Sequence, residues 1–249
     1  MLNSVKSEFR KLLSVRSTYA MVLIGIVLIM LFAGFGDGYK ASSDSLRSAL
    51  LLAGDSGSGI ALIGLIFAFA GLLLLGHEYR YNTIMYTLVN SPSRLRSFLA
   101  KVVVISVFSI VMSVFVVFFA PLCTLIGLHL HGYHLVAQQF DWWQLLWRGV
   151  FVGWGYGMFA FILVALLRNQ IGAIVTFLLV PLIGENILDH IWSATDKYLP
   201  FKNLQAIILN LSQKGSGTFS TSHAVVVTLV YVVAGLLIGA VLFQKRDAN

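Results

Sequence analysis

Charged residues are scarce in this chain: only 11% of its 249 residues are Asp, Glu, Lys or Arg. Soluble domains carry about 25%. Hydrophobic residues make up 58%, and the mean hydropathy is +0.88. A soluble protein of this size could not hide that much apolar surface, whereas a bilayer accommodates it. The shortage of charge therefore excludes an ordinary soluble fold and predicts an integral membrane protein.

Cysteine is nearly absent as well. Cys123 is the only one and lies within an apolar run, so the sequence offers neither an intrachain disulfide nor a cysteine pair for a metal site. We interpret it as a small packing residue. The polar segment before the first apolar run is long, and no small-residue cleavage pattern follows it. A cleaved signal peptide is therefore not expected.

Apolar runs long enough to cross about 30 Å of hydrocarbon as helices recur along the whole chain. They cover residues 19–35, 59–76, 102–128, 146–167, 171–189 and 224–243. The third run is the longest and contains Pro121, where we expect the helix to bend unless it tilts. The sequence thus predicts an all-α polytopic membrane protein with about six transmembrane helices, in a single domain that covers residues 1–249.

The distribution of the basic residues predicts the orientation of the chain. The 17 Lys and Arg exceed the 10 Asp and Glu and give a net charge of +7. They lie between the apolar runs rather than on one face, so topology explains them better than nucleic-acid binding, and no nucleic-acid partner is expected. With the N-terminus inside, eleven basic residues fall in inside segments and six in outside ones. We predict a multi-pass protein of the cell membrane with both termini in the cytoplasm.

Residues 1–18 have the pattern of an amphipathic helix. One helical face is apolar and the basic side chains lie elsewhere, which is typical of a helix in the membrane interface. Its cations would face anionic head groups, so membrane lipids are an expected partner. The apolar face carries Val5, Phe9, Leu12 and Leu13, and the basic residues are Lys6, Arg10, Lys11 and Arg16. Such a helix either anchors the chain and sets its topology or has a mechanical role, and the sequence leaves both interpretations open.

Two apolar runs carry glycines at four-residue spacing. Gly149, Gly153 and Gly157 lie in the fourth run, and Gly235 and Gly239 lie in the last. One face of each helix is then bare of side chains, so a neighbouring helix can approach closely. These glycines predict packing contacts and carry no information about function.

The inside segment between the second and third runs, residues 77–101, is longer than a simple connector needs. Glu78 and Arg80 place charge at the end of the second run. Residues 83–89 have the pattern of a short apolar helical turn, which Pro92 ends. The basic residues Arg94, Arg96 and Lys101 then lead back to the bilayer. A short helix in such a segment offers a rigid cytoplasmic protrusion to a soluble partner.

In these features the chain resembles the ABC-type-2 permeases, the membrane subunits of ATP-binding-cassette exporters. Members of that family begin with an interfacial elbow helix and have six spans. After the second span they show a Glu, then Gly-Thr, then Pro-x-Ser-Arg or similar, and a Lys that opens the third span. The residues that match here, in order, are Glu78, Thr83, Pro92, Ser93, Arg94 and Lys101. Asn82 stands where the family usually has Gly, and Leu199-Pro200 resembles the family's re-entrant segment before the final span.

The resemblance implies that residues 77–101, Arg80 among them, form a cytoplasmic coupling helix that docks into an ATPase subunit. The chain has no Walker A pattern, so ATP and magnesium would be bound by that partner, and this chain would bind no cofactor and would not be an enzyme. Because two ATPases act as a pair, a second permease chain, identical or different, is implied. The implied function is export of an amphipathic or hydrophobic substrate, namely a peptide, a lipid or a drug.

Three histidines just outside the third run raise the alternative of a metal site. His129, His131 and His134, near Asp141, have a spacing that suits zinc or copper. Aromatic residues surround them, so we favour polar residues within an interfacial aromatic belt. If they did bind metal, the chain would be a membrane-bound metal-dependent enzyme. A non-transporting membrane scaffold is a further alternative.

Glu185 and Asp189 are the only acidic residues within a predicted span, and they lie one helical turn apart. Ionisable groups inside a membrane usually face a cavity or a partner. If these two lie deep, they line a substrate pathway or a contact between subunits. If the fifth span ends early, they are ordinary residues of the outer surface, and the sequence does not decide between these interpretations. By contrast, residues 168–170 have the composition of a tight inside turn.

Overall fold

The computed structural model describes residues 2–31, 72, 75–81, 93–130, 142–212 and 220–245, and every regular element among them is a helix. The first elements are α1 (Leu2–Ser14), α2 (Arg16–Ile29) and, after a gap in the description, a short helix over residues 75–80. The long helices α6 (Arg94–Leu130) and α7 (Trp142–Leu167) follow. Then come α8 (Gln170–Leu179), a π-helical stretch (Val180–Gly184), α9 (Glu185–Ile191), a 3-10 helix (Ser193–Tyr198), α10 (Pro200–Ser212) and α11 (Thr221–Lys245).

Four helical segments of the described chain are long and apolar enough to cross a membrane. They are Arg94–Ala120, Leu146–Leu167, Gln170–Ile191 and Thr221–Lys245, and they correspond to the last four predicted spans. α1 and α2 pass the same test only as a pair, which is bent by 64°. The helical, membrane-compatible architecture is therefore confirmed. The predicted second span, 59–76, lies almost entirely outside the described residues, so six spans stay a prediction.

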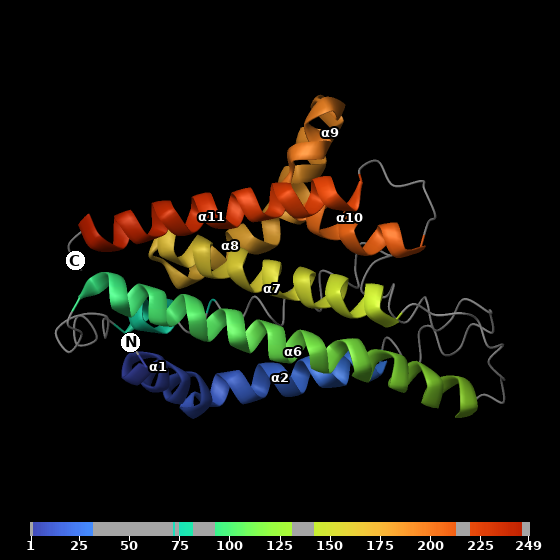
Figure 1. The fold of residues 1–249 in the computed structure, drawn as a ribbon, viewed down its shortest axis with the longest axis horizontal. Helices are drawn as coiled ribbons and strands as arrows, with labels where there is room; N and C mark the ends of the chain where they lie inside the picture. Colours follow the sequence, from blue (N-terminus) through green and yellow to red (C-terminus); the bar gives the residue numbers. More distant parts are fainter. Residues whose placement is uncertain are drawn as a thin grey trace.

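α7 is the central helix of the bundle. It contacts α6, α8, α10 and α11, and Figure 1 shows it between α6 and α11. Of the span Leu146–Leu167, 67% is buried, compared with 33% of the α6 span and 17% of the α11 span. The core therefore lies around α7, and the outer helices turn apolar side chains outward. Such an outward face requires an apolar environment, as a bilayer provides.

One end of the bundle collects both chain ends. Figure 1 shows the N-terminus with α1, the start of α6 and the C-terminus with the end of α11 at this end. Hydrogen bonds place Arg168, directly after α7, against the last turns of α11. We call this region the termini end. Several helices therefore begin or end in this region.

α6 differs from the predicted third span. It begins at Arg94, eight residues before the predicted start at Val102, and its 37 residues correspond to about 55 Å. Such a helix extends well beyond about 30 Å of hydrocarbon. The helix runs on past Pro121 to Leu130, although its membrane-compatible part ends at Ala120, directly before the proline. The last part of the predicted loop 77–101 is thus helical, and it lies in α6.

The predicted close approach at glycines is confirmed. A Cβ on Gly149 would lie 2.5 Å from Val117 Cγ2 on α6, and one on Gly235 would lie 2.7 Å from Ile162 Cγ2 on α7. A Cβ on Gly157 would overlap the Ser109 hydroxyl. Real Cβ atoms do not approach other atoms so closely, so α6 and α11 can reach α7 only where side chains are missing.

We expect Gly157→Ala to destabilise the bundle by about 1–3 kcal/mol, because the added methyl group would overlap Ser109 at the α6–α7 contact. Thermal unfolding of the purified protein in detergent measures the effect. Gly184→Ala is the matched control, since the nearest atom to its added Cβ lies 3.9 Å away. Equal stability of the two variants would contradict the close contact between α6 and α7.

Candidate functional site

Four charged side chains meet in a buried cluster at the termini end. Lys101 Nζ on α6 lies 2.6 Å from Glu8 Oε2 on α1 and 2.7 Å from Glu78 Oε1 on the 75–80 helix. Lys11 Nζ on α1 lies 2.9 Å from Glu8 Oε1 and 2.9 Å from Glu78 Oε1. We call these four residues the charge quartet. It joins three segments that are far apart in the sequence.

The quartet is buried to an unusual degree for charged groups. The side chain of Lys101 is 0% exposed, and those of Glu8 and Glu78 are 5% and 8% exposed, whereas Lys11 is 42% exposed. Removing an ammonium group from water costs several kcal/mol unless carboxylates and hydrogen bonds replace the water. Two carboxylates do so for Lys101, and the two positive and two negative charges cancel. The three segments can therefore separate only by exposing or unpairing a buried charge.

The pKa values of Glu78 and Lys11 follow from this arrangement. Burial alone would raise the pKa of Glu78, but the ammonium groups of Lys101 and Lys11 outweigh it and hold the pKa below its ordinary value of 4.5. For Lys11, burial alone would lower the pKa, but Glu78 and Glu8 outweigh it and raise the pKa above 10.5. Both groups are thus held in their charged forms at neutral pH.

Ser93 and Arg94 position the first turn of α6. The Ser93 hydroxyl accepts a hydrogen bond from the Arg96 backbone N–H (3.3 Å), which caps the start of the helix. The guanidinium of Arg94 donates to the Gln244 carbonyl near the end of α11 (3.3 Å). A cation at a helix C-terminus stabilises the exposed carbonyls and the helix dipole. Both residues therefore have structural contacts at the termini end.

The turn between α7 and α8 is a second device at the same end. Arg168 has a φ of +53°, a left-handed conformation that glycine usually occupies after a helix. Its guanidinium donates to the Leu242 carbonyl of α11 (3.1 Å). The Asn169 side chain accepts from the N–H groups of Ile171 (3.0 Å) and Gly172 (3.2 Å) and caps α8. The predicted tight turn is confirmed, and Arg168 in addition binds the end of α11.

The 75–80 helix also packs against this turn. A Cβ on Gly76 would lie 2.8 Å from Gln170 Cγ, at the start of α8. Burial raises the pKa of the Tyr79 phenol, and the nearby charge of Arg168 opposes that increase. The short helix therefore touches α8 as well as sharing the quartet with α1 and α6. A displacement of this helix would act on all three.

Arg80 and Tyr81 are the exposed end of the short helix. Tyr81 is 63% exposed, and the Arg80 guanidinium carbon lies 5.6 Å from the centre of its ring. The His77 ring contacts the same tyrosine edge-on, with the ring centres 5.8 Å apart. An exposed arginine next to an exposed aromatic ring is the composition that protein interfaces favour.

The structure separates the residues predicted to couple to an ATPase into two groups. Glu78 and Lys101 are buried in the quartet, so their side chains do not lie on the surface, and their predicted part in coupling to an ATPase stays a prediction. Arg80 is exposed, and Ser93 and Arg94 are half-buried at the start of α6. Thr83 and Pro92 lie outside the described residues. Since a buried charge requires a partner, Glu78 and Lys101 hold the short helix, α1 and α6 in place.

The predicted interfacial helix also changes in detail. α1 ends at Ser14, and Arg16 already begins α2, so residues 1–18 are not one helix. Leu12 is 1% exposed, and Val5 and Phe9 pack against the core, so this apolar face contacts the protein. Leu13, which was placed on that face, is 42% exposed. Arg10 is exposed, whereas Lys11, predicted to face lipid head groups, contacts the carboxylates of Glu8 and Glu78.

Glu185 and Asp189 both bind α10. The Glu185 side chain accepts hydrogen bonds from the backbone N–H groups of Phe201 and Lys202, both at 2.8 Å, and the residue is 2% exposed. A carboxylate at a helix N-terminus satisfies unpaired N–H groups and the helix dipole. Asp189 Oδ2 lies 2.7 Å from Lys202 Nζ. These contacts give both acids a structural task, the attachment of α10 to the α8–α9 segment.

The histidine cluster is only partly described. His129 is exposed near the end of α6, and His131 and His134 lie outside the described residues. In the part of the chain that the structure does describe, no three His, Cys, Asp or Glu side chains gather as metal ligands. Metal binding by the three histidines therefore stays untested.

Sequence reasoning missed Glu8, a member of the quartet. It is the one acidic residue in α1, placed among the basic residues that suggested a lipid-facing helix. Its position three residues before Lys11, on the side of the helix that carries Val5 and Leu12, was the available signal. A carboxylate on an otherwise buried helical face requires a cation opposite it.

We expect Lys101→Met to destabilise the protein by about 3–5 kcal/mol, because it leaves Glu8 and Glu78 buried with Lys11 as their remaining quartet partner. Lys202→Met is the control, since its pair with Asp189 is partly exposed and contributes about 0–1 kcal/mol. Thermal unfolding in detergent measures both. A similar loss in the two variants would rule out a special energetic role for the quartet.

The quartet also predicts the pH dependence of stability. A carboxyl whose folded pKa lies below 4.5 contributes stability that is present above that value and is lost as the pH falls through the folded pKa. For Lys11, stability is present below pH 10.5 and is lost as the pH rises through its higher folded pKa. Unfolding temperatures should therefore fall at both extremes. Between neutral pH and about pH 3 the decrease should be smaller in Glu78→Gln, which lacks the titrating group; an unchanged slope would contradict the prediction.

No model of a known protein family matches this chain, and no curated protein matches it. Its functional interpretation therefore depends on the chain's own residues and their geometry. The resemblance of residues 77–101 and of the span pattern to ABC-type-2 permeases stays a hypothesis. The geometry adds that the segment carrying the resemblance is tied to α1 and α6 by a buried set of charges.

Proposed function

We propose that the chain is the permease subunit of an ABC-type exporter, driven by a separate ATPase subunit that binds ATP and magnesium. The observation that carries this proposal is the charge quartet. In such a machine the closure of two ATPases must move the membrane helices through a stiff cytoplasmic contact, because a flexible loop would absorb the motion. In this reading the termini end of the bundle faces the cytoplasm.

The quartet gives the short helix the required stiffness. A displacement of residues 75–81 acts directly on Glu78, which shares Lys101 with α6 and Lys11 with α1. Glu8 closes the set by binding both lysines. Because separating α1, the 75–80 helix and α6 would unpair buried charges, these three segments move as one unit. α6 then carries the motion into the bilayer through its contact with α7.

The outward faces of the helices support a hydrophobic or amphipathic substrate. α2 and α6 expose large apolar side chains along their length, among them Leu23, Val27, Val111 and Phe118. A second permease chain, identical or different, would cover part of such a surface, and the substrate would pass or be extracted at the interface between the two chains. A peptide, a lipid or a drug fits that chemistry equally well.

Arg80 and Tyr81 supply the docking contact in this proposal. They are exposed at the tip of the short helix, beyond the buried part that holds it. Contact and transmission are then separate tasks of neighbouring residues. Arg80 and Tyr81 bind the ATPase, and Glu78, two residues before Arg80, transmits the motion to α6 and α1.

The test is co-purification of an ATPase with the full chain from cross-linked native membranes. We expect Arg80→Ala combined with Tyr81→Ala to reduce the recovered ATPase roughly tenfold, because interface arginines and tyrosines are typical energetic hot spots. The unfolding temperature should not change, since both side chains are exposed. A captured protein counts only if mass spectrometry identifies a Walker A sequence in it.

Arg16→Ala combined with Tyr19→Ala is the matched control, because it removes another exposed arginine and another exposed tyrosine, on α2. This variant should recover as much ATPase as the native chain. Absence of any ATPase from the cross-linked native sample would favour a non-transporting scaffold or a membrane-bound enzyme. Equal loss in both variants would remove the docking role of Arg80 and Tyr81.

A further inference from the structure

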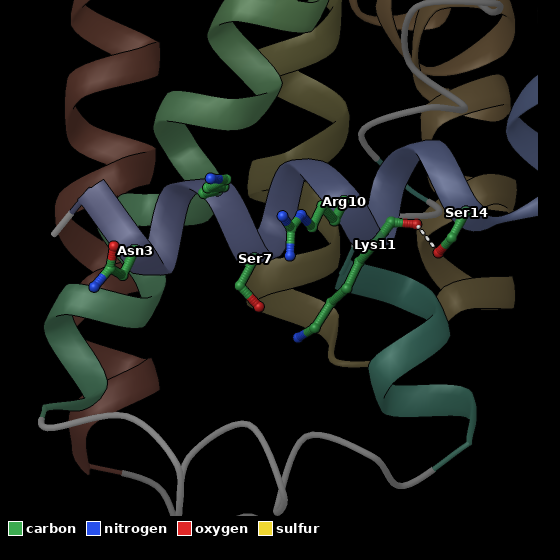
Figure 2. A pocket seen from close by; sticks show the side chains of 6 residues that line it. Asn3, Ser7, Arg10, Lys11 and Ser14 are labelled. Carbon is green, nitrogen blue, oxygen red and sulfur yellow. Dashed lines mark hydrogen bonds between the residues drawn. The ribbon is translucent and has the colours of Figure 1, made fainter.

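A shallow, open cavity of about 490 Å³ lies over the polar face of α1. Its lining residues recur at the three- and four-residue spacing of a single helical face. They are Asn3, Lys6, Ser7, Arg10, Lys11 and Ser14. Figure 2 shows the Ser7 and Lys11 side chains projecting from α1 on the same side. The opposite face of the helix packs against the core through Phe9 and Leu12.

The charge of this cavity is positive and unbalanced. Within the quartet, Lys11 and Lys101 are balanced by Glu8 and Glu78. Lys6 and Arg10 are both exposed, and neither forms an ion pair within the part of the chain that the structure describes. Among the lining residues that the structure describes, two positive charges are therefore in excess. Its three cations extend from two consecutive turns of one helix and line the same cavity.

The uncharged lining residues suit an oxyanion. The Ser7 hydroxyl and the Asn3 amide add hydrogen-bond donors beside the cations. The planar guanidinium of Arg10 matches phosphate oxygens in a two-pronged fashion, and lysines bind the same oxygens as point charges. The Ser14 hydroxyl donates to the Lys11 carbonyl (3.0 Å), so its proton is engaged within α1.

We propose that this cavity is a binding site for a phosphate group, with Lys6 and Arg10 as its principal ligands and Lys11 as the link to the charge quartet. A phosphate monoester carries about −1.5 to −2 charges at neutral pH, which matches the excess of two. The phosphate belongs either to a membrane lipid head group or to a soluble ester. The exposed apolar side chains of Leu13 and Leu23, on α1 and α2, offer acyl chains a surface to lie against.

The proposed site differs from a general attraction between a basic helix and an anionic membrane. Lys11 is the one cavity residue whose ammonium also contacts Glu8 and Glu78. A phosphate in the cavity adds a third anion next to Lys11, so its occupancy acts on the charge quartet. The inference requires no ATPase, so it stands or fails independently of the proposed function.

The test uses the purified full chain in neutral detergent and a short-chain fluorescent phosphatidic acid, with binding followed by fluorescence anisotropy. Lys6→Gln combined with Arg10→Gln should weaken binding at least roughly tenfold, because charge-assisted hydrogen bonds to both side chains are lost. Arg96→Gln combined with Lys245→Gln is the matched control, because it also removes one exposed arginine and one exposed lysine, both outside the cavity. It should change the affinity by less than about twofold.

Competitors distinguish the two sources of phosphate. Displacement of the probe by glycerol 3-phosphate or inorganic phosphate indicates a site that recognises the phosphate group alone. Displacement only by unlabelled phosphatidic acid, and not by phosphatidylcholine, indicates a lipid head-group site. Either result supports the proposed phosphate site, provided that the variant with Lys6→Gln and Arg10→Gln loses probe binding. Equal weakening in the two double variants, or equal binding of fluorescent phosphatidic acid and phosphatidylcholine, would overturn the proposal, and unfolding temperatures verify that both variants are folded.

Discussion

The rest of the termini end depends on one constraint, the burial of the Lys101 ammonium group. An ammonium group that is 0% exposed must be surrounded by anions and acceptors, because water no longer solvates it. Glu8 and Glu78 meet this requirement from two other segments, and Lys11 balances the second negative charge. Hydrophobic contacts tolerate small displacements, since they are not directional. A buried ion network does not, and it therefore selects one relative placement of α1, the 75–80 helix and α6.

Helix ends supply the second set of constraints. The backbone groups at the end of a helix have no partner within that helix. Arg94 and Arg168 donate to carbonyls near the end of α11, and Glu185 accepts from two N–H groups at the start of α10. In each case a charged side chain from outside the helix satisfies the helix end. Arg168 does so from a left-handed backbone conformation, where glycine would avoid the strain but could not reach α11.

The termini end and the α9–α10 region use charge differently. At the termini end, buried charges and arginines bind segments from both halves of the chain. At the α9–α10 region, Glu185 and Asp189 bind the neighbouring α10, and Figure 1 shows α9 projecting away from the long axis of the bundle. The break between α8 and α9 coincides with a π-helical stretch that contains Pro181, which cannot donate a helical hydrogen bond. A mechanical coupling would therefore enter the bundle at the termini end.

The sequence by itself determined the helical class and the approximate position of the last four spans, because the length of an apolar run and the thickness of a bilayer are local quantities. It also determined the glycine contacts on α7, since a missing side chain is a local property. Only the tertiary structure decided that α6 starts at Arg94, that Glu78 and Lys101 are buried, and that Glu8 completes their pairing. Those outcomes depend on which segments meet in space. The partner of a charge 93 residues away is set by packing, and no periodicity in the sequence encodes it.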